Sequence, residues 1–472
     1  MSKKRNPSIV EALSIIFILI VMIYLSVFKF GRSALVPIII GIFIVTAISL
    51  FRLKVSWCDL ESAIVSTISM ALPSIIILML VSITVAVWMA SGIVPSIIYY
   101  GLDIISPTFF LPACTIICAI TALGTGSSWT TVGTIGIALL GIGQGLGLSA
   151  SVVGGAIISG SYFGDKLSPL SDTTNLASAM TGTNLFEHIK HMLYTTVPTF
   201  IISIILYLII GFKSVNNSLN LNEIEVLQSG LINNFNSLSP LFLLVPIIVI
   251  VLVVRKVPAI PSLFIGVLLG SIIAMFVQGV SFPQFLDIVE YGYISQTNIE
   301  VVDSLLTRGG LNSMMPVIAL TICALSLGGV LEKTGVLETI LNSLLKLASN
   351  DFKLILTTMC TCFFINFTTG DQYLSIVLPG KMYTPAYNKV GLHSKNLSRA
   401  LEDSATLTSP IIPWNACGIY MATTLGISVW SYLPFAFVNL INPILSLIYA
   451  YFNITITRCG ASKVRSKLNS IT

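Results

Sequence analysis

The sequence predicts an all-α polytopic membrane protein with two repeats of inverted topology, whose re-entrant hairpins or broken helices meet at a central site. Three observations support this: the composition, two polar interruptions in apolar sequence, and a recurrence of Pro, Gly and Ser between the halves. Of the 472 residues, 55% are hydrophobic and 9% are charged, whereas soluble proteins have roughly 25% charged residues. The composition excludes an ordinary soluble enzyme. The net charge of +5 lies in clusters at segment ends, which favours membrane orientation over nucleic-acid binding.

The first half contains the apolar runs expected of spanning helices, which need about 20 residues. These runs are 13–28, 34–51, 63–90, 107–123 and 192–212. The first follows a basic cluster but precedes no small-residue cleavage site, so we expect a retained helix. Two shorter Gly-rich runs, 135–148 and 152–163, are expected to form the arms of a re-entrant hairpin or a broken helix.

The polar segment 213–239 is predicted to be a linker loop between a first transmembrane repeat, 1–212, and a second, 240–472. A second polar segment, 281–308, contains four acidic residues. The segment 336–348 is amphipathic and is expected at the membrane interface. The remaining runs are 241–254, 262–279, 314–331, 354–367, 397–407 and a final pair ending near Ile456.

Residues that interrupt helices recur between the halves at nearly constant offsets of 241 to 244. The matching pairs are Pro73 with Pro316, Gly92 with Gly335, Thr125-Gly126 with Thr369-Gly370, and Ser168-Pro169 with Ser409-Pro410. Interrupted segments at corresponding positions of two halves are typical of transporter binding sites. The alternative is a chance recurrence of residues that are common in membrane helices.

Basic residues of short loops stay on the cytoplasmic side of a membrane. The termini and the loops with Arg52, Lys54, Arg255 and Lys256 are therefore predicted to be cytoplasmic, whereas 213–239 and 281–308 are predicted to be outside. Lys29 and Arg32 oppose this scheme. Each half then crosses an odd number of times, so the repeats are inverted.

A topology reporter fused at Asn217 tests this orientation. We expect it to report a non-cytoplasmic position, because 213–239 is poor in Lys and Arg. A cytoplasmic signal would contradict the inverted topology.

The first polar centre ends in the sequence Gly164-Asp-Lys-Leu-Ser-Pro-Leu-Ser-Asp-Thr-Thr-Asn175. Pro169 is expected to break the helix there and to free carbonyl groups that can bind Na⁺. Asp172 and Asn175 are the predicted Na⁺ ligands, and Ser168 and Thr173 add further oxygens. The alternative for Asp172 is a helix N-cap.

Hydroxyl-rich sequence at 124–131 is the predicted opposing element. Its candidate ligands are Thr125, Ser127, Ser128 and Thr131, and a helix-packing seam of small residues is the alternative. In the second half, the corresponding candidates are Thr368, Thr369, Asp371, Ser409 and Asn415.

Carboxylates in membrane segments are functional by default, and burial favours their neutral form, which lets them exchange a proton for a cation. The candidates for proton coupling are Asp172, Asp371, Glu402 and Asp403. Glu402 has a structural alternative, pairing with Arg399.

Other titratable residues have more than one interpretation. Asp165 beside Lys166 is either an ion pair at a segment end or part of transport. His188 and His191 are expected at the interface, and Arg308 is interpreted as a loop cation, with an anionic substrate as the alternative. The cysteines, among them Cys114, Cys118, Cys360 and Cys362, are expected to be buried hydrophobes rather than metal ligands.

The polar centres resemble those of the NhaC family of Na⁺/H⁺ antiporters. The resemblance rests on three stretches: Gly124-Thr-Gly-Ser-Ser-Trp-Thr-Thr-Val-Gly-Thr-Ile-Gly136, the sequence from Gly155 to Ala177, and His188-Ile-Lys-His-Met-Leu-Tyr-Thr-Thr-Val-Pro198. It implies secondary active exchange of Na⁺ and H⁺ in a prokaryotic cytoplasmic membrane, with no cofactor other than these ions. Related members look like malate and lactate exchangers.

The predicted function is therefore Na⁺/H⁺ exchange by alternating access, and the alternative is exchange of an organic acid or amino acid coupled to Na⁺ or H⁺. An intramembrane enzyme is disfavoured, because no Ser/His pair is placed near the Gly- and Ser-rich centres. The expected partners are small cations and the lipid bilayer, with an organic anion and a second copy of the chain left open and no nucleic acid.

Overall fold

The computed structural model describes residues 5, 7–104, 106–215, 221–255, 257–299, 302–303 and 306–459. Within these ranges the chain is helical, and its two β-bridges, Tyr293 with Arg308 and Leu392 with Arg458, are isolated. The prediction of an all-α protein is confirmed. The predicted cytoplasmic residue Lys256 and the reporter position Asn217 lie outside the described residues, as do the N-terminal four residues and 460–472.

Several helices are long and apolar enough to cross a bilayer. Among the described residues there are five, or seven if each of two bent pairs counts as one span. The five are α5 (Pro107–Thr125), α10 (Leu185–Val215), α13 (Ala259–Phe276), α16 (Leu311–Lys333) and α18 (Asp351–Thr369). Large apolar side chains on them point outward, including Ile120, Phe212 and Phe264. Such exposure suits contact with lipid, and the chain is a multi-pass membrane protein.

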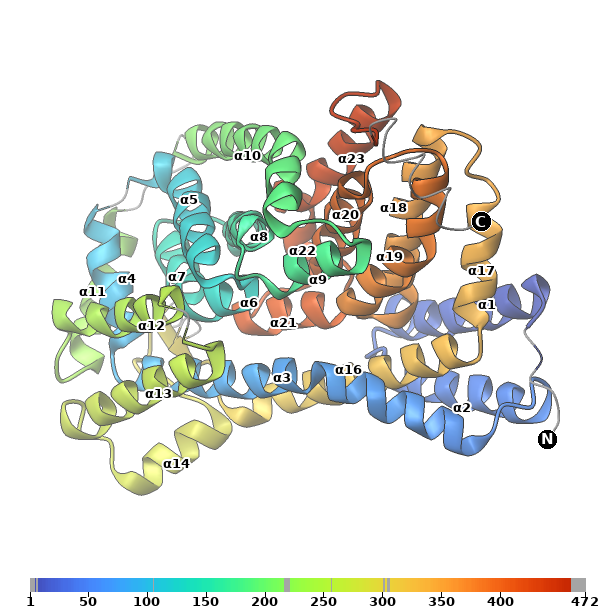
Figure 1. Cartoon of the computed structure of the whole chain (residues 1–472). Coiled ribbons are helices and arrows are strands. Elements are labelled where there is room, and N and C mark those ends of the chain that lie inside the picture. The colour runs from blue at the N-terminus through green and yellow to red at the C-terminus, as the bar shows by residue number, and fades with distance from the viewer. Residues whose placement is uncertain are drawn as a thin grey trace.

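The longest helix, α3 (Trp57–Ala90), packs antiparallel against α16 along one side of the molecule (Figure 1). Lys333 Nζ lies 3.1 Å from Asp59 Oδ1 at one end of the pair. At the other end, the hydroxyl groups of Ser82 and Ser313 are 3.2 Å apart. Pro73 and Pro316 lie within these two helices, so the matching prolines belong to neighbouring antiparallel helices.

Further elements correspond between the halves. α5 and α18 both end at a glycine in the left-handed conformation, Gly126 with φ 68° and Gly370 with φ 66°, where a side chain would be strained. α9 (Asp172–Thr181) and α21 (Ala416–Leu425) both have ten residues. These correspondences agree with the recurrence in the sequence, and the orientation of the halves in a membrane stays a prediction.

The Gly-rich runs of the first half form a hairpin. The first arm is η2 (Val132–Gly136), a π-helical turn, followed by α7 (Ile137–Gly145), and the second is α8 (Ala150–Leu167). α8 packs closely against α5, because an added Cβ at Gly160 or Gly164 would collide with the carbonyl oxygens of Thr115 and Ala119.

The two polar segments contain helices that hydropathy did not indicate. α11 (Leu221–Asn234) lies within 213–239, and α14 (Phe282–Tyr291) lies within 281–308. Short amphipathic helices can form in polar sequence when one side packs on the protein. The remaining helices are α1 (Ile9–Tyr24), η1 (Leu25–Lys29), α2 (Leu35–Phe51), α4 (Ile93–Ile104), α6 (Ser128–Thr131), η3 (Pro240–Leu243), α12 (Leu244–Val254), α17 (Val336–Leu345), α19 (Gln372–Lys389), α20 (Ser394–Leu401), η4 (Glu402–Thr406), η5 (Ser409–Ile411), α22 (Val429–Tyr432), η6 (Leu433–Phe435) and α23 (Phe437–Tyr451).

The close packing of α5 on α8 predicts a stability effect. Gly164→Val should destabilise the protein by about 1–3 kcal/mol, the usual cost of overpacking, since its side chain meets the backbone of α5. Thermal unfolding in detergent measures the effect. Gly391→Ala is the control, because that position has φ 74° but open space, so only local strain is added. Equal unfolding temperatures for Gly164→Val and the wild type would contradict the packing argument.

Candidate functional site

A small cavity lies where four helices begin. The N-terminal ends of α6, α9, α19 and α21 converge on it, and Ile77 of α3 and Thr321 of α16 close one side. Its volume is about 60 Å³, and one water molecule needs roughly 10–15 Å³ on this measure. The central cavity, as we call it, therefore has room for an ion with a few water molecules.

Each helix end at the cavity has a polar cap from this chain. In each case a side chain accepts a hydrogen bond from a backbone N–H group in the first turn of the helix. The caps are Ser127 for α6 at 3.1 Å, Ser171 for α9 at 3.5 Å, Asp371 for α19 at 2.7 Å and Asn415 for α21 at 3.0 Å. Such caps satisfy N–H groups that a helix leaves unpaired. The predicted break at Pro169 is confirmed, because α8 ends at Leu167 and α9 begins at Asp172. The residue that caps α9 is Ser171, so the alternative that Asp172 is the N-cap is wrong.

Three carboxylates line the cavity: Asp165, Asp172 and Asp371. Asp165 Oδ2 accepts a hydrogen bond from Ser128 N at 3.0 Å, while its buried Oδ1 has no hydrogen-bond partner among the described residues. Asp172 Oδ1 accepts one from Thr173 N at 2.8 Å, and Asp172 Oδ2 accepts one from Tyr373 Oη at 2.5 Å. Among the described lining residues there is no Lys, Arg or His. The cavity is therefore acidic.

The structure brings some of the predicted site residues to this cavity. Ser127, Ser128, Asp172, Thr173 and Asp371 line it. Sequence reasoning left Asp165 ambiguous and did not select Trp129, Gln372, Tyr373 or Cys417 as site residues, although they also line it. The signal for Gln372, Tyr373 and Cys417 was available, because each follows a helix cap by one or two residues.

The other predicted ligands support the cavity from outside its lining. Thr131, Thr368 and Thr369 donate their hydroxyls to backbone carbonyls one turn earlier. The amide of Asn175 donates to Pro169 O at 2.9 Å and Ser171 O at 2.6 Å, so it secures the break and does not line the cavity. The rest of this supporting group is Thr125, Ser168, Ser409 and the cap Asn415.

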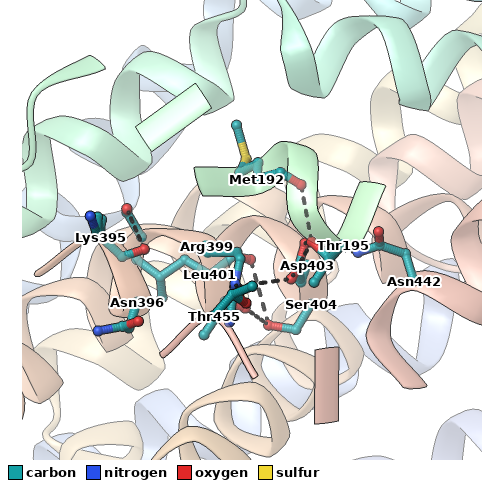
Figure 2. Close-up of polar contacts among 12 residues, drawn as sticks. Met192, Thr195, Lys395, Asn396, Arg399, Leu401, Asp403, Ser404, Asn442 and Thr455 are labelled. Atoms are coloured by element: carbon teal, nitrogen blue, oxygen red, sulfur yellow. Dashed lines mark hydrogen bonds and ion pairs between the residues drawn. The ribbon is translucent and has the colours of Figure 1, made fainter. Parts of the chain in front are cut away.

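A buried ionic network lies beside the cavity, and Asp403 is its centre (Figure 2). Lys166 forms an ion pair with Asp403, and Arg399 Nε lies 3.9 Å from Asp403 Oδ2. Thr195 Oγ1 and Asn442 Nδ2 donate to the same carboxylate at 3.1 and 2.8 Å. The network joins α8, α10, α20, η4 and α23. Asp403, predicted as a proton-coupling residue, thus lies in a structural network outside the central cavity.

Several sequence interpretations need correction here. Lys166 pairs with Asp403 and not with Asp165. The alternative that Glu402 pairs with Arg399 is also wrong, because Arg399 pairs with Asp403. The two carboxylate oxygens of the buried Glu402 have no hydrogen-bond partner among the described residues.

The histidines and cysteines also differ from expectation in part. His188 and His191 are buried rather than interfacial, because α10 begins at Leu185 and turns them into the protein. Cys114, Cys118 and Cys362 are buried as predicted, but Cys360 lies on the outward side of α18. In the part of the chain that the structure describes, no three His, Cys, Asp or Glu side chains are placed to hold one metal ion together. The three cavity aspartates therefore do not form a joint ligand set.

A multi-pass helical protein with an acidic, ion-sized cavity at broken helix ends has the design of a membrane ion transporter. Residues 160–454 match the model of the Na⁺/H⁺ antiporter family. The chain belongs to this family, which is a family of transporters and not an enzyme class, and the resemblance to NhaC antiporters is confirmed.

The chain is similar to curated proteins over nearly its whole length. It is 42% identical over 467 residues to the Na(+)/H(+) antiporter NhaC of Alkalihalophilus pseudofirmus, covering 99% of each chain. It is 39% identical over 455 residues to the malate-2H(+)/Na(+)-lactate antiporter of Bacillus subtilis, covering 96% of each. It is 37% identical over 450 residues to the arginine/ornithine antiporter ArcD of Halobacterium salinarum, covering 95% of this chain and 93% of that one.

The Lys166–Asp403 pair predicts non-additive stability effects. Removing one partner, as in Lys166→Met, should cost about 3–5 kcal/mol, because a buried charge loses its main partner. Lys166→Met/Asp403→Leu should cost less than the sum of the single substitutions, since it removes both charges. Thermal unfolding of the four proteins in detergent measures this. Additive effects would contradict a direct pairing.

Proposed function

We propose that this protein exchanges Na⁺ for H⁺ across the prokaryotic cytoplasmic membrane by alternating access, and that the central cavity is the exchange site. The observation that carries the proposal is the gathering of Asp165, Asp172 and Asp371 around a cavity of about 60 Å³. Carboxylate and hydroxyl oxygens are the ligands that a hard cation prefers. Membership of the Na⁺/H⁺ antiporter family supports the same ions.

Exchange follows from competition for the same oxygens. A carboxylate at the cavity binds either a proton or Na⁺, so one site can carry one ion in each direction. Asp172 is the proposed principal carrier, because it is exposed at the cavity mouth while Asp165 and Asp371 are buried. Ser127 and Thr173 are the proposed neutral oxygen ligands, and Asp371 supplies further negative charge.

The helix ends tune this site. Each helix N-terminus has roughly half a positive charge, which stabilises nearby carboxylates. Four such ends offset part of the charge of the three aspartates, so Na⁺ binds weakly enough to be released. The cytoplasmic location of both termini, and assembly into a homodimer, remain part of this proposal.

Exchange of an organic anion or amino acid is the second candidate, favoured by the names of two similar antiporters. The central cavity argues against it as the primary function. It is smaller than the roughly 300–1,000 Å³ of most small-molecule sites, and its four helix ends are capped by this chain's own side chains. A substrate carboxylate would have to displace a cap.

Asp172→Asn should abolish Na⁺-dependent proton exchange in everted vesicles, because the amide cannot release a proton. The matched control is Asp287→Asn, an exposed residue of α14 outside the cavity, which should keep wild-type activity. Near wild-type exchange by Asp172→Asn would remove that residue from the mechanism.

A proteoliposome assay with the wild type separates the two candidate functions. Na⁺, Li⁺, K⁺, malate, lactate and amino acids are each tested against a pH gradient. We expect Na⁺ to drive proton movement without any organic solute. A strict requirement for an organic solute would favour the second candidate.

A further inference from the structure

Three cavities follow one another along the antiparallel pair α3 and α16. A cavity of about 530 Å³, which we call the outer cavity because it lies at one end of the pair, is lined by Ser66 and Thr67 of α3 and by Glu332 of α16. This is the end next to Arg52 and Lys54, which the sequence predicts to be cytoplasmic. The central cavity comes next, at Ile77 and Thr321. A third cavity of about 290 Å³ lies at the opposite end, at Ser82 and Ser313, and is also lined by Arg308. The order is the same on both helices, so the cavities lie along one line through the protein.

The central cavity adjoins the outer cavity but not the Arg308 cavity. Asp371 and Tyr373 line both the outer and the central cavity. The central cavity and the Arg308 cavity share no lining residue. Between them, α21 places the buried Tyr420, whose ring stacks on Trp129 with centroids 4.5 Å apart and whose hydroxyl donates to Trp129 O at 2.6 Å. The Trp129–Tyr420 stack therefore lies between the central cavity and the Arg308 cavity, whereas Asp371 and Tyr373 lie between the central cavity and the outer cavity.

Tyr373 lies at the boundary of the outer and central cavities and contacts the principal carboxylate. Its hydroxyl donates to Asp172 Oδ2 at 2.5 Å, which links α19 to α9. The other oxygen, Asp172 Oδ1, accepts from the backbone N–H of Thr173. Each oxygen of Asp172 thus accepts one hydrogen bond, and the tyrosine hydroxyl occupies the side of Oδ2 that faces Tyr373. A cation that approaches Oδ2 from that side competes with the hydroxyl.

We propose that Tyr373 is a displaceable cap on the ion site: its hydroxyl holds Asp172 while the site is empty and gives way to a cation that arrives from the outer cavity. Tyr373 is a positioning residue that sets the apparent affinity for Na⁺ by competing with it. The proposal rests on the assignment of the central cavity as the exchange site. A purely structural role, in which Tyr373 only joins α9 to α19, makes a different prediction for Na⁺ affinity.

Tyr373→Phe removes the competing hydroxyl and keeps the ring. The KM for Na⁺ of exchange in everted vesicles should fall by roughly three- to tenfold, the effect of one net hydrogen bond. Tyr383→Phe is the matched control, because Tyr383 lies on the same helix and its hydroxyl bonds Thr361 at 2.9 Å away from the three cavities. It should leave the KM unchanged. An unchanged KM in Tyr373→Phe would leave only the structural role, and a raised KM would make Tyr373 an ion ligand; either result overturns the proposal.

A second measurement does not depend on turnover. Cys417 lines the central cavity, so its alkylation by a small uncharged reagent, read by peptide mass spectrometry, reports access to the site. Na⁺ should slow alkylation in the wild type, and Tyr373→Phe should shift this protection to lower Na⁺ concentration. If Na⁺ protects Cys417 from alkylation at the same concentration in both proteins, the proposed role of Tyr373 is overturned and the assignment of the cavity stands. No protection in the wild type would overturn the assignment of the cavity itself.

Discussion

The structure depends on one constraint: every helix that breaks inside an apolar protein must have its end satisfied from within. An unpaired backbone group in hydrocarbon costs several kcal/mol. At four neighbouring helix ends, backbone N–H groups donate hydrogen bonds to the side chains of Ser127, Ser171, Asp371 and Asn415, which avoids this cost. Because the ends converge, their caps and first-turn residues form a polar cavity as a direct result of satisfying the backbone, and the same positive helix ends make carboxylates tolerable there.

The antiparallel pair α3 and α16 forms one wall of this cavity, through Ile77 and Thr321. Contacts at Asp59 and Lys333, and at Ser82 and Ser313, hold its two ends in register. The broken helices lie against the middle of the pair (Figure 1). Alternating access needs one part that stays and another that moves. The three cavities lie along this pair, so movement of the broken helices against it would change which end of the line is open.

Charge inside the protein is divided between two places. Around the cavity, three carboxylates lie without a basic partner in the lining, which suits reversible binding of ions. Beside it, Asp403 lies among Arg399, Thr195 and Asn442 (Figure 2). Lys166 forms an ion pair with the same carboxylate, so its charge is paired. Buried ion pairs are costly to break, and this one joins helices of both halves. The network therefore holds together the helices beside the cavity that we propose as the exchange site.

The sequence by itself determined the membrane class, most spanning helices and the break at Pro169, because hydropathy and proline chemistry act over neighbouring residues. It also indicated Asp172 and Asp371, since carboxylates in apolar sequence stand out. It could not separate cavity-lining residues from their supports: Asn175 secures a turn, Asp403 joins an ion network, and Asp165 and Tyr373 reach the cavity. That distinction depends on contacts between residues some 200 positions apart, such as Tyr373 with Asp172, which only the tertiary structure decides.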